Sequence, residues 1–193
     1  ADGNIVYTPA LAAMLIYLNR TGFNGLFRVN SSGAFNVPAG RYDRPRIADR
    51  VRVRRVADAL ASPGVSLQWC SFTEAERIAA AGDFLYIDPP YAPMSGTANF
   101  TSYTASRFGA DEQRALQRMV VDLAHRGCHV LLSNSTAPTI ADLYDGNRDT
   151  RGAGLRALRV PARRAVNSKA AGRGLVDEYL ITNIEAATAA VIG

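Results

Sequence analysis

The residues best suited to chemistry form one short run, Asp88-Pro89-Pro90-Tyr91, which directly follows the apolar run 84–87. Each proline fixes its own φ angle and removes a backbone N–H, so the turn is stiff and no helix begins there. The run therefore holds a carboxylate, a fixed backbone carbonyl and an aromatic ring within one small space. Together these three groups suit a planar base that carries an exocyclic amine.

An exocyclic amine on an aromatic base is a poor nucleophile because its lone pair is delocalised into the ring. If Asp88 and the Pro89 carbonyl accept its hydrogens, the nitrogen moves toward tetrahedral geometry and the lone pair is freed. The carboxylate then stabilises the charge that develops as the nitrogen attacks an electrophile, which favours the transition state over the ground state. Tyr91 stacks on the base. A turn that only ends a strand is the alternative interpretation.

Strand and helix patterns alternate around this run. The predicted strands lie at 65–70, 84–88, 128–134, 155–160 and 177–183. The predicted helices lie at 9–20, 47–61 and 110–126, with one from Thr73 and a short one after Pro138. This alternation predicts a three-layer α/β fold with a mostly parallel sheet, in which the last two strands form an antiparallel pair. Asp88 then lies at the carboxyl end of a central strand, where such sheets bind ligands.

An irregular segment of about twenty-five residues follows the first predicted helix, and long irregular segments in compact proteins are usually functional or disordered. Residues 26–30 and 34–37 flank a Ser-Ser-Gly turn and predict a small hairpin. The aromatic residues and glycines of the segment favour an ordered structure.

Composition limits the kinds of partner. The chain has 193 residues, with 22 Lys and Arg against 17 Asp and Glu, a net charge of +5, and Lys169 as its one lysine. Arginine forks suit phosphates and guanine edges, which favours nucleic acid, although a GC-rich genome also produces arginine. Cys70 and Cys128 are predicted to be buried thiols of a reducing compartment. No metal site, signal peptide or membrane-spanning run is predicted, so we expect a cytoplasmic protein.

The run at 88–91 matches the Asp/Asn/Ser-Pro-Pro-Tyr/Phe/Trp motif of S-adenosylmethionine-dependent amino-methyltransferases. With the runs 88–108 and 18–42, the chain resembles Dam-type (D12 class) DNA adenine-N6 methyltransferases over nearly its whole length. The resemblance implies a Rossmann-like S-adenosylmethionine-dependent methyltransferase sheet with a small target-recognition subdomain. It assigns residues 1–62 to a DNA-binding recognition region and 63–193 to the C-terminal part of the catalytic domain.

The resemblance also implies roles for individual residues. Asp88, Pro89, Pro90 and Tyr91 would surround an adenine that has left the duplex, because the amine cannot be reached inside it. Ser71, Phe72 and Asp88 would contact the cofactor, S-adenosylmethionine. The DNA-binding positions would be Arg20, Phe23, Asn24, Leu26, Arg28, Asn30 and Arg41.

Within that set the implied contacts differ. Phe23 replaces a family tyrosine that inserts beside the extruded base, and Asn24 contacts the orphaned partner. Leu26 makes an apolar base contact, and Arg28 contacts guanine with both arms of its fork. Arg20, Asn30 and Arg41 contact phosphates. A late basic loop, which includes Lys169, lies near the extruded base and the DNA backbone. The expected partner is double-stranded DNA, the expected target is GATC, and the expected state is a nucleoid-associated monomer.

The chain departs from the family in one respect. The family begins with a lysine-containing segment and a glycine-rich F-x-G-x-G turn that hold the cofactor, and neither occurs here. We therefore expect an N-terminally incomplete chain, in which the strand 84–87 lacks a neighbour and S-adenosylmethionine binds poorly. A catalytically incompetent DNA-binding fragment is the main alternative. An RNA guanine or glutamine methyltransferase is a second alternative, which the recognition segment disfavours.

Overall fold

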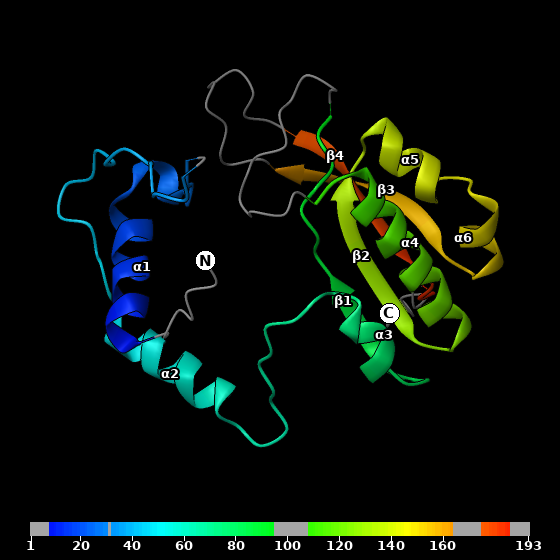
Figure 1. The fold of residues 1–193 in the computed structure, drawn as a ribbon, viewed down its shortest axis with the longest axis horizontal. Coiled ribbons are helices and arrows are strands. Elements are labelled where there is room, and N and C mark those ends of the chain that lie inside the picture. Colours follow the sequence, from blue (N-terminus) through cyan, green and yellow to red (C-terminus); the bar gives the residue numbers. More distant parts are fainter. Residues whose placement is uncertain (1–7, 31, 95–107, 164–174, 186–193) are drawn as a thin grey trace, which may run out of the picture. The chain divides into compact units, whose positions relative to one another are not determined.

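The structure is a computed structural model that describes residues 8–30, 32–94, 108–163 and 175–185 (Figure 1). The chain divides into two compact units at Trp69. The first unit contains two helices and the irregular segment between them, and the second contains a sheet with helices packed against it.

The two helices of the first unit confirm the predicted positions. Helix α1 (Pro9–Thr21) begins after Thr8, whose Oγ1 accepts a hydrogen bond from the Leu11 N–H at 3.2 Å, and has proline at its first position. Helix α2 (Arg50–Leu60) begins later than predicted because Asp49 is its N-cap, accepting from the Arg52 N–H at 3.0 Å.

The irregular segment is an ordered, closed loop. Isolated antiparallel bridges join Gly22 to Ala39 and Val29 to Phe35. The predicted hairpin is therefore confirmed, but its strands are reduced to single bridges. The short 3₁₀ turn η1 (Phe23–Gly25) lies at the base of the loop.

The second unit is built on a four-stranded mixed sheet with the order β1-β2-β4-β3. The strands are β1 (Phe84–Ile87), β2 (His129–Ser135), β3 (Arg156–Arg163) and β4 (Leu175–Thr182). Strands β1 and β2 are parallel, and the other two pairings are antiparallel. The antiparallel pairing of the last two strands is confirmed. The expectation of a mostly parallel sheet is wrong for the described strands, and β1 lies at an edge instead of the centre.

The described residues of this unit form four helices: α3 (Glu74–Ile78), α4 (Ala110–His125), α5 (Pro138–Tyr144) and α6 (Arg148–Gly152). Helix α4 begins where the Glu112 side chain accepts from the Gly109 N–H at 2.7 Å, and this acidic first turn suits the helix dipole. Gly127, at φ +86°, lets the chain turn back just after the helix.

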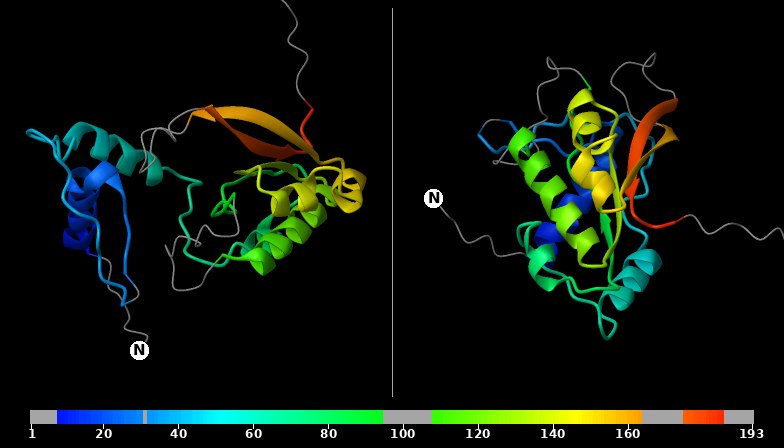
Figure 2. Two further views of the ribbon diagram at one scale, coloured as in Figure 1. Left: turned by 90° about the horizontal axis from the view of Figure 1, so that it is seen from above. Right: turned by 90° about the vertical axis from the view of Figure 1, so that its right-hand side faces the viewer.

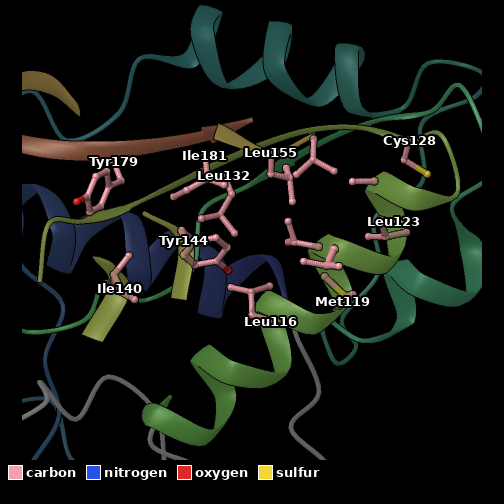
Figure 3. Packing of buried hydrophobic residues seen from close by; sticks show 14 of the residues in the cluster. Leu116, Met119, Leu123, Cys128, Leu132, Ile140, Tyr144, Leu155, Tyr179 and Ile181 are labelled. Carbon is pink, nitrogen blue, oxygen red and sulfur yellow. The ribbon is translucent and has the colours of Figure 1, made fainter. Parts of the chain in front are cut away.

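One face of the sheet carries the core, and among the described residues the opposite face is exposed at β1. Alternation along β2 turns Val130 and Leu132 toward the apolar stripe of α4, and Tyr179 and Ile181 of β4 join them (Figures 2 and 3). On the opposite face, Phe84 and Tyr86 remain 59% and 60% exposed. The expected third layer is therefore not seen among the described residues, because the described helices pack on the core face.

The predicted strand at 65–70 is wrong. Residues 65–70 form no regular structure and are exposed, with Trp69 at 98%. A strand needs a neighbour for its backbone N–H and C=O groups, and no described strand lies beside this segment. The predicted buried thiol is accordingly wrong at Cys70, which follows the segment, and confirmed at Cys128. No helix in the described ranges is both long and apolar enough to span a bilayer.

Tyr144 provides a test of the core. Its ring is 1% exposed, and among the described residues its hydroxyl has no hydrogen-bond partner, so burial raises the Tyr144 pKa. Because a buried hydroxyl without a partner costs free energy, Tyr144→Phe is expected to raise the free energy of unfolding by about 1 kcal/mol.

Urea denaturation measures the effect of Tyr144→Phe. The control is Tyr179→Phe, because the Tyr179 hydroxyl bonds to Asp145 at 2.8 Å and to Arg159 at 2.9 Å. The control should lower stability. A loss of stability in Tyr144→Phe would show that its hydroxyl is paired after all.

Candidate functional site

The Asp-Pro-Pro-Tyr turn lies at the carboxyl end of β1, next to the end of β2. The β1–β2 register pairs Ile87 with Leu132, so the following residues, Asp88 and Ser133, lie on the same face of the sheet. Ser133 Oγ donates a hydrogen bond to Asp88 Oδ1 at 3.0 Å. Asp88 is nevertheless exposed, so its carboxylate is oriented by the protein and remains open to a ligand.

Tyr91 is half-buried at the far end of the turn. Its hydroxyl donates to Glu178 Oε2 of β4 at 3.3 Å. Burial raises the Tyr91 pKa, and the negative charges of Glu178 and Asp88 act in the same direction, while the Ser133 hydroxyl opposes them. The phenol therefore stays neutral near pH 7, and its ring is held by a contact to a neighbouring strand.

A buried network of polar side chains holds the backbone of the turn through hydrogen bonds to Pro90 and Ala92. Gln113 of α4 donates from Nε2 to the Pro90 carbonyl at 2.9 Å. Asn134 of β2 donates to Gln113 Oε1 at 3.1 Å and accepts from the Ala92 N–H at 3.2 Å. Ser135 Oγ donates to the Ala92 carbonyl at 2.6 Å. Three side chains that are at most 3% exposed thus hold the backbone on both sides of Tyr91.

Sequence analysis missed this network. Its signal was present as Ser133-Asn134-Ser135, three polar residues that end an otherwise apolar strand. Polar residues at the carboxyl end of a strand beside β1 lie at the same sheet edge as Asp88, where α/β sheets bind ligands. Glu178 gave no comparable signal, because its contact with Tyr91 depends on how β4 pairs with β2.

The Pro89 carbonyl is the second acceptor expected to hold the amine. Within the part of the chain that the structure describes, no donor is hydrogen-bonded to it, whereas the next carbonyl, that of Pro90, is taken by Gln113. The turn thus presents one fixed carbonyl beside an exposed carboxylate. These two acceptors match the two hydrogens of an exocyclic amine.

Two of the three expected cofactor residues, Ser71 and Phe72, lie just before α3, and the third is Asp88. Ser71 is exposed, and its Oγ accepts from Thr73 Oγ1 at 2.9 Å. The Phe72 ring packs edge-on against Phe108, with centroids 5.6 Å apart, and contacts the core cluster. Phe72 therefore has a packing role in this unit, and no contact joins either residue to Asp88 among the described residues.

In the first unit, three of the four predicted base-contacting residues, Phe23, Asn24 and Leu26, share one turn. Asn24 has φ 53°, a left-handed conformation that asparagine tolerates, and the Asn19 side chain donates to the Gly25 carbonyl at 2.7 Å. This turn leaves the Phe23 ring 45% exposed. Leu26, at the end of the turn, is half-buried.

Two further predicted DNA-binding residues have internal partners. Arg28 is exposed and donates across the hairpin from Nε to Asn36 Oδ1 at 2.8 Å and from Nη2 to the Asn36 carbonyl at 3.0 Å. Its Nη1 end can still reach a ligand. The Asn30 side-chain oxygen accepts from the Ala34 N–H at 2.9 Å and so stabilises the hairpin turn, which leaves its amide group for a phosphate. Arg20 and Arg41 are exposed.

The net positive charge of the protein is located in the first unit. Residues 1–69 contain nine arginines and four aspartates, whereas residues 70–193 contain thirteen basic and thirteen acidic residues. The whole net charge of +5 therefore comes from residues 1–69. The late basic loop around Lys169 lies outside the described residues. In the described ranges, no group of three or more His, Cys, Asp or Glu residues could hold a metal ion.

The carboxylate-bearing turn lies at the carboxyl end of a parallel strand, which is where α/β sheets bind ligands. Residues 3–159 match the model of the D12 class N6 adenine-specific DNA methyltransferase family. The chain belongs to this family, which confirms the resemblance found in the sequence.

Curated relatives agree with this family. A Type II methyltransferase of Lactococcus lactis subsp. cremoris is 37% identical over 172 residues, or 89% of this chain and 58% of the relative. A DNA adenine methylase of Vibrio cholerae is 39% identical over 166 residues, or 86% and 56%. The DNA adenine methylase of Escherichia coli is 36% identical over 171 residues, or 88% and 57%. The chain thus spans little more than half the length of these relatives.

Proposed function

We propose that this protein acts in the transfer of a methyl group to N6 of an adenine in duplex DNA, with the adenine extruded from the helix. The observation that carries this proposal is the exposed Asp88 carboxylate, oriented by Ser133 at 3.0 Å beside the stiff Pro-Pro turn. Asp88 and the Pro89 carbonyl would accept the two amine hydrogens, and the carboxylate would stabilise the developing positive charge. Family membership supports the same chemistry.

The neutral Tyr91 phenol would hold the base. Because its hydroxyl is bonded to Glu178 at 3.3 Å, the ring orientation is fixed before a base arrives. A preorganised stacking surface lowers the entropic cost of holding an extruded base. After methyl transfer, the nitrogen becomes acidic and loses its proton readily, so no strong general base is needed.

We further propose that the sheet is one half of a Rossmann-like sheet. In the doubly wound order 3-2-1-4-5-6, β1 and β2 correspond to the adjacent parallel strands 4 and 5. The edge of β1 that is unpaired among the described strands would then pair with strand 1 of such a sheet.

Methyltransferases of this kind take their methyl group from S-adenosylmethionine, which supplies an electrophilic methyl when bound. The described residues fit one side of such a site: Asp88 is exposed at the sheet edge, and Ser71 is exposed before α3. The glycine-rich turn by which a backbone approaches a cofactor closely is not part of this sequence. We therefore propose that the described residues form one side of the cofactor site and that a glycine-rich turn forms the other side.

The alternative is a DNA-binding fragment without catalysis, which is favoured by the edge of β1 that is unpaired among the described strands. Isothermal titration of the protein with S-adenosylmethionine separates the two functions. Heat that saturates in the millimolar range or below supports the enzyme. No heat, together with retained binding to a GATC duplex, supports the fragment.

Sequence selection depends on Arg28 in this proposal, with GATC as the target. A guanine contact by an arginine fork contributes about 1–3 kcal/mol of discrimination. Arg28→Gln is therefore expected to reduce the preference for GATC over a duplex with a changed first base by about 5-fold to 150-fold. Fluorescence anisotropy on the two duplexes measures this ratio.

The matched control for Arg28 is Asn36→Ala, which removes the side-chain partner of Arg28 Nε and keeps the arginine. Its effect on the GATC preference should be smaller than that of Arg28→Gln. Equal affinity of the unsubstituted protein for both duplexes would remove Arg28 from its proposed role.

A further inference from the structure

Helix α2 carries four arginines within six residues, Arg50, Arg52, Arg54 and Arg55, which we define as the α2 arginine cluster. All four residues are exposed. No ion pair in the described part of the chain involves any of them, whereas several arginines of the second unit are paired with acids. The α2 arginine cluster is thus a dense positive patch, and the two aspartates next to it in the sequence, Asp49 and Asp58, balance at most half of its charge.

The positions of the four arginines destabilise helix α2. Arg50 and Arg54 are four residues apart, and Arg52 and Arg55 are three apart, so each pair places like charges side by side. The cluster begins at the first residue of α2, where the helix dipole is positive and disfavours cations. The first turn contains no acidic residue. Residues that oppose local stability in this way mark functional positions, because a ligand can compensate their repulsion.

The surroundings of Asp49, the N-cap residue of α2, lower the pKa of its carboxyl group. The backbone N–H of Arg52 lowers the Asp49 pKa most, and the positive charges of Arg52 and Arg46 lower it further. Asp49, which directly precedes the cluster, caps the helix by accepting from the Arg52 N–H at 3.0 Å. Asp49 and Asp58 together carry two negative charges against four positive ones, so an additional anion is needed to neutralise the cluster.

The cluster is continuous with a predicted DNA contact. Arg52 of α2 and Arg20 of α1 line the same hollow of about 410 Å³, together with Asn19. Arg20 is one of the positions expected to contact a phosphate. The positive surface therefore extends from the end of α1, next to the loop that contains Phe23 and Arg28, onto α2.

We propose that the α2 arginine cluster is a second DNA contact, which binds the phosphate backbone without reading sequence. The inference rests on the proposed DNA function and adds a surface to it. A regularly spaced polyanion matches several unpaired charges along one helix, and the arginine fork suits phosphate oxygens. An anionic membrane surface also binds basic amphipathic helices. DNA is favoured because the cluster lies in the same unit as the recognition loop, and because that unit holds the whole net charge.

The test uses the full chain and two duplexes, one with GATC and one with the same bases in scrambled order. Binding is measured by fluorescence anisotropy between about 50 and 200 mM salt. Arg52→Gln with Arg55→Gln removes two neighbouring charges. It is expected to reduce the slope of log affinity against log salt by about 1.8, because each lost phosphate contact changes the slope by about 0.9. Affinity should fall by the same factor for both duplexes.

The matched control is Arg114→Gln with Arg118→Gln, which removes two exposed arginines from α4 of the other unit. Its salt slope should equal that of the parent. Circular dichroism serves as the folding control, because removing the repulsion should leave the helical signal of α2 intact or increase it. Reduced binding with an intact helical signal cannot then be explained by unfolding.

Every other outcome contradicts either the α2 contact or the proposed function. An unchanged slope in the α2 variant, with normal binding by the parent, overturns the α2 contact and leaves the proposed function standing. A change in the ratio of the two affinities overturns sequence-independent binding. Failure of the parent to bind either duplex contradicts the proposed function itself. Parent binding to phosphatidylserine vesicles that the α2 variant loses, with no change on DNA, assigns the cluster to a membrane surface and overturns the inference.

Discussion

Asp88→Asn is expected to reduce methyl transfer to less than a tenth of the unsubstituted protein, and by about 10²–10³ if the carboxylate acts mainly through transition-state charge. The substitution keeps the size of the side chain but replaces a negative acceptor by a neutral amide. The Ser133 hydrogen bond at 3.0 Å has an acceptor oxygen in both proteins, so the turn should keep its position. DNA affinity should be unchanged, because Asp88 acts on the amine and contributes no attraction to phosphate.

Single-turnover transfer from labelled S-adenosylmethionine to a GATC duplex measures this effect, with protein in excess over DNA so that slow turnover is detected. The matched control is Asp83→Asn, an aspartate just before β1, at the opposite end of that strand. Asp83 Oδ2 accepts from the Ala80 N–H at 2.9 Å, and asparagine can preserve that bond. Activity of the Asp88 variant above a tenth of the parent would contradict the mechanism.

Asn134→Ala is expected to lower the free energy of unfolding by about 3 kcal/mol. Asn134 is fully buried, and alanine leaves Gln113 Oε1 and the Ala92 N–H without partners. Each buried polar group left unpaired costs about 1–3 kcal/mol. Because these bonds hold the backbone beside Tyr91, the substitution should also loosen the turn that carries the acceptors.

Urea denaturation gives the global effect of Asn134→Ala, and hydrogen exchange of the Ala92 amide gives the local effect. Exchange at Ala92 should accelerate, because the amide loses its acceptor. The control is Asn147→Ala, which removes a less buried asparagine that caps α6 through bonds of 3.0 and 3.2 Å, and it should cost about 1 kcal/mol. Equal costs for the two substitutions would show that the network does not hold the turn.

Helix positions followed closely from local sequence. Thr8-Pro9 predicts the start of α1, and the acidic first turn and Gly127 predict the limits of α4; both helices are found there. Capping and the helix dipole involve residues within one turn, so neighbouring residues suffice to locate them. The start of α2 was predicted too early because Ile47 and Ala48 extend the apolar pattern of the helix to positions before its true cap, Asp49.

Strand predictions were less secure, because a strand exists only with its neighbours. The runs 65–70 and 84–87 look alike as sequences, but only the second pairs with another described strand. The position of β1 at an edge and the exposure of Phe84 and Tyr86 also depend on which other elements lie beside the strand, so they could not be predicted from the run 84–87 itself.

The sequence by itself identified the Asp88-Pro89-Pro90-Tyr91 turn on which the proposed chemistry rests, the family of the chain, and the positions of most helices. Stiff prolines and local caps act over a few residues, so they can be found in a linear sequence. Tertiary structure alone decided the supports of the turn, namely Ser133 on Asp88, Gln113 and Asn134 under the backbone, and Glu178 on Tyr91. These contacts join residues 21 to 87 positions apart, and sheet register with helix packing brings them within hydrogen-bonding distance.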